Sequence, residues 1–305
     1  MIESNKTGWE LFKTLTDHEK VVKSLTVLKD GYTLVSGDCE KILLWDTEEG
    51  KTLLGHSDCV TILIVLSDGT LVSGSEDKTI LFWNTDTGET IKKLTGHTKT
   101  IWSLVELQDE TLASGSKDKT IILWNTTTGK STKILTGHDD TVECLVLLPD
   151  GTLASGSDDK KIILWNYKTG TIIKSLTGHI GAVNHLAVLQ DGILASGSTD
   201  KTIRLWNVKT GQTIKTLTGH THTIWYLAVL HDGTLASASC DHTIKIWNTE
   251  TGTTTETLTN HTSCVNCLAV LDDGTFASGS NDRKIKLWFY RADKPLSTIN
   301  LASIY

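Results

Sequence analysis

Residues 96–136 read GHTKTIWSLVELQDETLASGSKDKTIILWNTTTGKSTKILT and contain four short runs of apolar and β-branched side chains, at 101–107, 111–116, 120–125 and 130–135. Each run has the length of a β-strand, and residues typical of turns separate the runs. The chain shows no sustained 3.6-residue periodicity of apolar residues, and it has only 2 prolines. This stretch therefore predicts a small antiparallel sheet of four strands.

The same pattern recurs along the chain at a fixed interval. Histidines are spaced by 38 and then repeatedly by 41 residues, at His18, His56, His97, His138, His179, His220 and His261. Tryptophans keep the same spacing, at Trp45, Trp83, Trp124, Trp165, Trp206, Trp247 and Trp288. An interval near forty residues indicates an array of like units. We therefore predict one domain of seven units over residues 1–305, although length alone suggests two domains.

Each unit contains Gly-His or a close variant, then a segment such as Leu-Ala-Ser-Gly-Ser-x-Asp, then a Trp, which is followed by Asn or Asp in six units and by Phe289 in the last. This order resembles the WD-repeat β-propeller family over residues 9–289. The resemblance implies an all-β fold, a seven-bladed β-propeller of four-stranded antiparallel blades around a central channel. The Asp that the family has after Trp is present only at Asp46, and Asn takes its place in five units. Because this pair begins a turn, we expect Asn to be tolerated.

Either end of the chain is a candidate for closing the ring. Residues 9–18, WELFKTLTDH, align with the fourth strand of other units, such as ETIKKLTGH at 89–97. The resemblance implies that they complete blade seven beside Trp288, with the blades spanning 19–289. The C-terminal segment 296–305, LSTINLASIY, is the alternative. We favour the N-terminal strand and expect residues 290–305 to form a tail, either an extra strand or disordered.

Every unit also holds a His, a Ser and an Asp that invite comparison with a hydrolase triad. An active site needs one such set in one pocket, whereas here the set recurs at the same spacing in six units. The resemblance implies a structural network in which Asp holds His, His reaches Ser and Ser meets the Trp ring N–H. The residues are His56, Ser73, Asp77, Trp83; His97, Ser114, Asp118, Trp124; His138, Ser155, Asp159, Trp165; His179, Ser196, Asp200, Trp206; His220, Ser237, Asp241, Trp247; and His261, Ser278, Asp282, Trp288.

The first unit departs from this pattern. It has His18, Ser36 and Trp45, but its turn is one residue short. We expect Glu40 to take the place of the Asp, and we expect blade one to be the least rigid blade.

Differences between units are concentrated in the five residues after each His and in the residue before each turn Asp. On a propeller these positions lie on one face around the channel mouth, here called the top face. Variable positions on a constant scaffold are where binding specificity is expected. The fifth residue after His, which in the family lines the channel entrance, is Lys23, Thr61, Trp102, Glu143, Asn184, Trp225 and Asn266.

Two tryptophans stand out because they are additional to the structural set. Trp102 in blade three and Trp225 in blade six should face each other across the mouth, and exposed aromatics are typical interface anchors. Blade four adds carboxylates beside Trp102, and aromatics near carboxylates suit a cation such as an Arg or Lys side chain. Histone-tail-reading propellers have a similar arrangement. The predicted peptide-binding residues are Trp102, Trp225, Glu143, Asp158, Glu76, Lys117, Asn184, Asn266 and Asn281.

The alternative is that both tryptophans pack against neighbouring rim side chains and that the carboxylates, which include Asp139 and Asp140, are simply solvated.

Six cysteines do not recur with the unit, so we expect free thiols rather than a disulfide framework. Cys39 with Cys59, and Cys240 with Cys264, occupy equivalent rim positions on adjacent blades, where a close thiol pair remains an alternative. Cys264 and Cys267 form a CxxC within a strand and should point to opposite faces, so we expect no metal or redox site there. His220 and His222 lack an evident third ligand, and we expect no metal and no cofactor.

Composition and charge narrow the function. The net charge of −7 argues against general binding to nucleic acid or to anionic membranes, and no apolar run has the length of a membrane span. We expect a cytoplasmic, or alternatively nuclear, protein that is a monomer by itself. The prediction is a non-enzymatic scaffold that binds a protein or peptide on the top face. The alternatives are a regulatory or substrate-recruiting module of a larger assembly and an enzyme with a site at the channel mouth.

Overall fold

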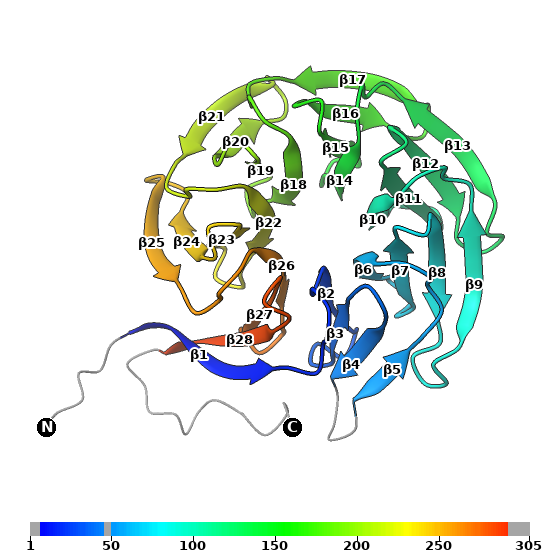
Figure 1. The fold of residues 1–305 in the computed structure, drawn as a ribbon. Helices are drawn as coiled ribbons and strands as arrows, with labels where there is room; N and C mark the ends of the chain where they lie inside the picture. The colour runs from blue at the N-terminus through cyan, green and yellow to red at the C-terminus, as the bar shows by residue number, and fades with distance from the viewer. Residues whose placement is uncertain (1–6, 46–49, 292–305) are drawn as a thin grey trace, which may run out of the picture.

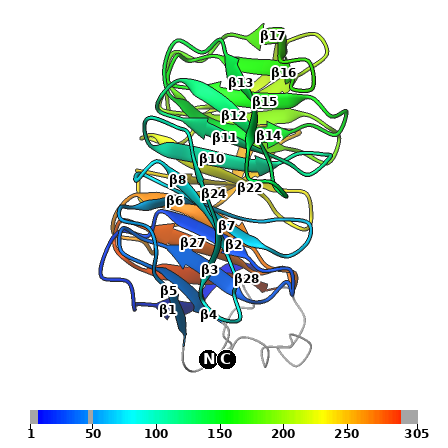
Figure 2. The same cartoon turned by 90° about the vertical axis from the view of Figure 1, so that its right-hand side faces the viewer.

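The computed structural model describes residues 7–45 and 50–291, and the strands in these ranges form seven antiparallel sheets of four strands each. Figure 1 shows the sheets arranged as blades around a central channel, and Figure 2 shows the disc from its side. The predicted all-β, seven-bladed propeller is confirmed. The elements within the described ranges are all strands, and these ranges therefore contain no helix that could cross a membrane.

In each blade the strands follow one another outward from the channel. Blades one to three contain β2 Ser24–Val27, β3 Leu34–Gly37, β4 Ile42–Trp45, β5 Lys51–Leu53; β6 Val60–Val65, β7 Leu71–Ser75, β8 Thr79–Trp83, β9 Thr90–Thr95; and β10 Ile101–Glu106, β11 Thr111–Ser116, β12 Thr120–Asn125, β13 Ser131–Thr136. Blades four and five contain β14 Val142–Leu147, β15 Leu153–Ser157, β16 Ile162–Asn166, β17 Thr171–Leu176; and β18 Val183–Val188, β19 Leu194–Ser198, β20 Ile203–Asn207, β21 Gln212–Leu217. Blades six and seven contain β22 Ile224–Val229, β23 Leu235–Ser239, β24 Ile244–Asn248, β25 Thr253–Leu258; and β26 Val265–Val270, β27 Phe276–Ser280, β28 Ile285–Arg291, with β1 Gly8–Leu15.

The ring is closed by the N-terminal strand. β1 pairs antiparallel with β28, with Leu11 opposite Trp288, so it is the fourth strand of blade seven. Figure 1 shows this blue strand along the outer edge of the red blade. The first two residues of the expected tail, Tyr290 and Arg291, belong to β28. The competing segment 296–305 and the Asp46 position lie outside the described residues.

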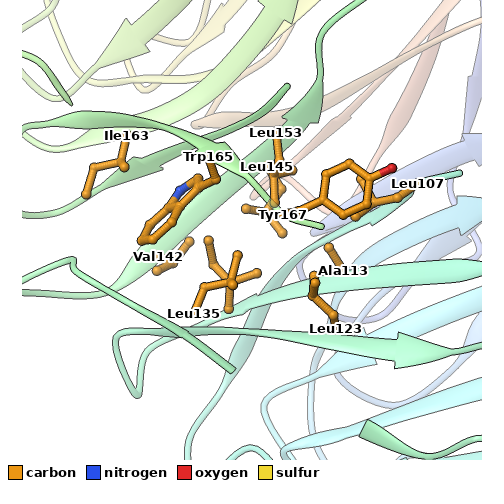
Figure 3. Packing of buried hydrophobic residues seen from close by; sticks show 11 residues of the cluster. Leu107, Ala113, Leu123, Leu135, Val142, Leu145, Leu153, Ile163, Trp165 and Tyr167 are labelled. Carbon is orange, nitrogen blue, oxygen red and sulfur yellow. The ribbon is translucent and has the colours of Figure 1, made fainter. Parts of the chain in front are cut away.

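The apolar core lies between neighbouring blades as well as within them. One buried cluster joins Leu107, Leu123 and Leu135 of blade three to Val142 and Trp165 of blade four. Figure 3 shows these side chains packed between the two sheets, with the Trp165 ring lying near Val142. Each blade thus buries its face against the next blade. Since no blade has a complete core of its own, closure of the ring is part of the folding unit.

A lysine contact repeats from blade to blade on the outer strands. The ammonium of Lys51 donates to the Thr85 carbonyl of blade two at 2.8 Å. Equivalent lysines of the next blades donate to carbonyls in the same turn of the following blade, where the third strand leads into the fourth; these are Lys92, Lys133, Lys174 and Lys215. A cation suits this place because the turn presents carbonyl oxygens toward the preceding blade.

Glu256 stands where the next lysine of this series belongs, at the junction of blades six and seven. In blade seven the fourth strand is β1, which no turn connects to the third strand. The start of β1 presents the backbone N–H of Trp9, which donates to Glu256 Oε2 at 2.8 Å. The donor and the acceptor are therefore exchanged where the ring closes.

We expect Glu256→Lys to weaken ring closure, because it removes the acceptor of the Trp9 N–H and places a cation beside a donor. An unsatisfied, partly buried donor costs about 1–3 kcal/mol. Urea unfolding followed by tryptophan fluorescence measures the change in the free energy of unfolding. Glu256→Gln keeps an acceptor oxygen and should unfold close to wild type. Equal stability of wild type and Glu256→Lys would show that this contact does not support closure.

Candidate functional site

A buried network of four side chains connects the strands of each blade. In blade three the indole N–H of Trp124 donates to Ser114 Oγ at 2.8 Å, and Ser114 Oγ lies 2.7 Å from His97 Nε2. His97 Nδ1 lies 2.8 Å from Asp118 Oδ2. A neutral imidazole with its proton on Nδ1 satisfies every partner, since Nδ1–H donates to Asp118 and Nε2 accepts the Ser114 hydroxyl.

The four-residue contact is present in every blade, including each set that the sequence predicts. Each Ser is fully buried, and each His is buried or nearly so. Such groups need internal partners, because an orphaned buried polar group costs about 1–3 kcal/mol. The network meets this need in every blade, because it provides each buried Ser and His with a partner.

Burial alone raises the pKa of Asp159, but the hydrogen bond and charge of His138 and two backbone N–H donors outweigh burial and lower that pKa to about 2. Asp282 responds in the same way to His261, and its pKa is also lowered to about 2. These carboxylates are therefore ionised throughout the neutral range, and their ionised form stabilises the fold.

In blade one the expectation that Glu40 replaces the turn Asp is wrong. Asp38 is fully buried, and its Oδ2 lies 2.6 Å from His18 Nδ1. Its Oδ1 accepts the backbone N–H of Glu40 and of Lys41, so this carboxylate also organises the shortened turn. The Glu40 side chain is exposed and pairs with Lys20 at 3.3 Å. The strands of blade one are shorter than their counterparts, while its lower rigidity stays a prediction.

The innermost strands β2, β6, β10, β14, β18, β22 and β26 surround the channel (Figure 1), and they line a cavity of about 390 Å³. Of the predicted binding residues, the cavity is lined by Trp102, Glu143, Asn184, Trp225, Asn266 and Asn281. Asp158, Glu76 and Lys117 do not line the cavity. Glu76 pairs with Lys23, which lines it, and the charges of Asp158 and Lys117 shift the pKa of Glu143. The structure thus places the two tryptophans around one cavity.

In blades two to seven a β-bulge explains why the fifth residue after His faces the channel. In β10 the pairing with β11 shifts between Ile101 and Ser103, so Trp102 has no partner in the ladder. The same shift occurs at Thr61, Glu143, Asn184, Trp225 and Asn266. A bulge redirects the side chain of the extra residue and leaves it free of the sheet register. These residues are therefore available to vary without disturbing the blade.

Three of these residues join one blade to the next. Asn184 donates from Nδ2 to the Ile224 carbonyl at 2.7 Å, and Asn266 donates from Nδ2 to the Val22 carbonyl at 2.9 Å. Thr61 donates from Oγ1 to the carbonyl of Ile101. Asn266 also donates to Asn281 at 2.7 Å. The amides predicted to bind a peptide are thus already hydrogen-bonded within the chain. The fifth residues that do not join two blades in this way are Lys23, Trp102, Glu143 and Trp225.

Lys23 covers one of the two tryptophans. Its ammonium lies 5.7 Å from the centre of the Trp102 ring and pairs with Glu76 at 2.5 Å. A cation over an indole face at this distance is a cation–π contact. The sequence placed Lys23 in the ring of fifth residues but did not include it among the binding residues. Its pairing also means that Glu76 is neutralised from within the chain.

Glu143 occupies the acidic side of the cavity. Burial raises its pKa, the charges of Asp158 and Asp140 add to this effect, and Lys117 opposes them, with a resulting pKa of about 8. Burial and the neighbouring charge of Asp140 also raise the pKa of Asp158, although a hydrogen bond with Thr141 and the charge of Lys117 lower it in part. Near pH 7 the Glu143 carboxyl is therefore mostly protonated.

His185 and Tyr226 line the cavity one residue further along their strands, and the sequence analysis did not single them out. Their ring centres lie 3.8 Å apart, and His185 Nδ1 accepts the Leu227 backbone N–H at 3.4 Å. Burial lowers the pKa of His185 to about 3 and raises the pKa of Tyr226 to about 12. Both side chains are uncharged near neutral pH. The sequence could have indicated them, because both are aromatic rings at the sixth residue after His in adjacent units.

The expectation of free thiols is wrong for four of the cysteines. Disulfides join Cys39 to Cys59, between blades one and two, and Cys240 to Cys264, between blades six and seven. Cys144 and Cys267 are free and buried, so Cys264 and Cys267 of the CxxC motif do not pair with each other. The indole N–H of Trp225 lies 3.0 Å from Cys240 Sγ, which places the second disulfide against the channel mouth.

Comparison with known proteins agrees with this geometry. The model of the family described as "WD domain, G-beta repeat" matches seven segments of the chain, at 9–46, 47–84, 88–125, 129–166, 170–207, 211–248 and 252–288. The chain belongs to the WD-repeat family. WD-repeat propellers typically bind proteins or peptides and are generally non-catalytic scaffolds. Each matched segment begins with the outer strand of one blade and ends with the third strand of the next.

Among solved structures, the WD-repeat chain is similar to the crystal structure of the WD40 β-propeller domain of Doa1, with a TM-score of 0.84 and 25% sequence identity. The likeness covers 93% of this chain and 97% of the Doa1 domain. No curated protein matches the sequence.

The lowered carboxylate pKa values predict how stability depends on pH. The free energy of unfolding gained from Asp159 is fully present above the unfolded-chain pKa of 3.8 and is lost as the pH falls through about 2. Asp159→Asn removes this group, so its acid-induced loss of stability between about pH 4 and pH 2 should be shallower than in wild type. Urea unfolding at a series of pH values measures the slope.

Asp86→Asn, at an exposed position, serves as the matched control and should keep the wild-type slope. The same slope in Asp159→Asn and wild type would contradict the assignment.

The disulfides predict a defined count of reactive thiols. Alkylation of the denatured protein without a reductant should add two groups, at Cys144 and Cys267, and alkylation after reduction should add six. Cys240→Ser should add three without a reductant, because Cys264 is released. Intact-mass spectrometry measures each count. Closing loops of this size stabilises a fold by about 2–4 kcal/mol, so reduction should lower the melting temperature. Six groups added without a reductant would contradict both disulfides.

Proposed function

We propose that this WD-repeat propeller binds a peptide segment of a partner protein at the channel mouth, and that the segment carries an arginine or lysine side chain. Support comes from the cavity of about 390 Å³, which is lined by Trp102, Trp225 and Glu143. Its volume is within the range of ordinary ligand pockets. The position that holds these two indoles and this carboxyl group carries Lys, Thr or Asn in the other four blades, as expected of a position that serves specificity rather than folding.

The observation that carries the proposal is the ammonium of Lys23 over the Trp102 ring. This contact is a cation–π interaction made at the cavity by the chain's own lysine. It supports the proposal because the face of Trp102 already receives a cation in this environment. Cation–π contacts contribute about 0.5–2 kcal/mol, with the larger value where water is excluded.

Trp225 supplies the second aromatic wall. Its side chain is 36% exposed, although its indole N–H is engaged by Cys240. A large aromatic side chain that keeps an exposed surface beside a cavity is typical of an interface anchor. The partner therefore meets the exposed indole of blade six and, in blade three, the indole that Lys23 covers, with a carboxyl group from blade four between them in chain order.

A peptide array probed with purified protein tests the proposal. Wild type should retain a subset of peptides enriched in arginine or lysine, and Trp102→Ala with Trp225→Ala should lose them. The double variant should keep a melting temperature close to wild type, because neither indole belongs to the buried network. A truncated interface anchor typically costs 2 kcal/mol or more, roughly thirtyfold in affinity.

Tyr32→Ala is the matched control, because Tyr32 is an exposed aromatic residue, at 44% exposure, that does not line the cavity. This variant should bind as wild type does. Unchanged binding by the double tryptophan variant, or a large loss of its stability, would sink the proposal in favour of simple rim packing.

A further inference from the structure

Glu143 differs from its counterparts because its carboxyl group is not engaged by the fold. Thr61, Asn184 and Asn266 each donate a hydrogen bond to a carbonyl of the next blade. Glu143 makes no hydrogen bond or ion pair with any other residue of the described chain, although it lies on the cavity wall and is mostly shielded from water. The carboxyl group of Glu143 therefore faces the cavity without a partner in the described chain and is available to a ligand.

The charges around Glu143 favour a cation. Asp158, in the turn after β15, and Asp140, before β14, both repel a negative charge on Glu143. Lys117, in the turn after β11, attracts it but is exposed to water, which weakens the attraction. On β14 itself Cys144 is buried, and on the facing strand β18 His185 lines the same cavity.

We propose that Glu143 receives the cationic group of the bound peptide and gives up its proton when the cation arrives. This inference rests on the proposed function and names the residue and the exchange through which it works. The carboxyl O–H bond breaks, the proton passes to water, and the carboxylate accepts N–H donors of the guanidinium or ammonium group. Nothing is oxidised or reduced. A guanidinium suits the site best, since its planar fork matches a carboxylate and its face stacks on an indole.

The exchange gives binding a defined dependence on pH. Because the pKa of Glu143 is raised to about 8, the protonated form dominates below that pH and the cation must displace a proton. Affinity should rise with pH by up to about tenfold per unit below pH 8 and level off above it. The other groups at the cavity do not produce this profile, because His185 has a pKa of about 3 and burial raises the pKa of the Cys144 thiol well above its usual range.

The test uses N-acetyl-arginine methylamide and its citrulline analogue, an uncharged compound of nearly the same shape. Tryptophan fluorescence titrations between about pH 6 and pH 9 measure affinity, and calorimetry in two buffers of different ionisation enthalpy measures protons released. Wild type should bind the arginine probe with the rising profile and release up to one proton per site below about pH 8. It should bind the citrulline probe weakly and without a pH dependence.

Glu143→Gln keeps the shape of the side chain but has no proton to exchange. It should bind the arginine probe more weakly at pH 8 and above, with a flat profile and no proton release. Asp158→Asn removes a like charge, which lowers the pKa of Glu143, so its profile should keep its slope while the plateau begins at lower pH. A rising profile and proton release retained in Glu143→Gln would overturn the inference.

Folding provides a readout that does not involve a ligand. An acid whose folded pKa is raised stabilises the fold at low pH, and this stabilisation is lost as the pH rises from about 4.5 through about 8. Glu143→Gln should therefore lose less stability than wild type across this range. Equal pH dependence in the two proteins would show that Glu143 is not held protonated and would also overturn the inference.

The two proposals fail in distinguishable ways. If the double tryptophan variant loses the arginine probe while Glu143→Gln binds it as wild type does at every pH, the channel mouth is the binding site and Glu143 is not the receiver. If wild type does not bind the arginine probe, both proposals are wrong. If both kinds of variant bind it as wild type does, the ligand sits elsewhere and both are again wrong.

Discussion

The hydrogen-bonded chain from tryptophan through serine and histidine to aspartate is the constraint on which the rest of the structure depends. In blade four it runs from Trp165 through Ser155 and His138 to Asp159, and it connects the third strand, the second strand and the approach to the first. A thin sheet cannot hide such polar groups unless every donor finds an acceptor. Because this demand is met inside each blade, the residues of the top face are free to take other chemistry.

Much of the fold and part of the site follow from comparing the units with one another. The period predicted the propeller, and the invariance of residues such as Ser114 and His97 predicted a structural network rather than a catalytic one. The variable fifth residue after each His predicted Trp102 and Trp225 at one cavity, where the structure places both. The propeller and the place of both tryptophans are confirmed, because a repeated unit shows which positions the fold constrains, while the structural rather than catalytic role of the network stays a prediction.

Contacts between blades were harder to predict, since they join residues of different units through geometry that no single unit contains. Asn184 and Asn266 looked available for binding, yet each completes a junction with the next blade. The pairing of Cys240 with Cys264 depends on the same junction geometry, and the sequence only signalled equivalent rim positions. Asp38 was missed because the shortened turn of blade one moves the carboxylate earlier in the chain, while its place in space is kept.

The exchange of lysine for Glu256 at the ring closure has a consequence for where a further unit can be added. A unit inserted between two interior units would supply a lysine that donates to the turn of the blade after it. It would also supply a turn whose carbonyls accept the lysine of the blade before it, so every interior junction would remain matched. A unit added after the last one would instead set Glu256 against carbonyl oxygens, acceptor against acceptor, and would leave Trp9 facing a lysine. The reversed hydrogen bond therefore distinguishes the closing junction from the interior junctions, whatever the number of units between them.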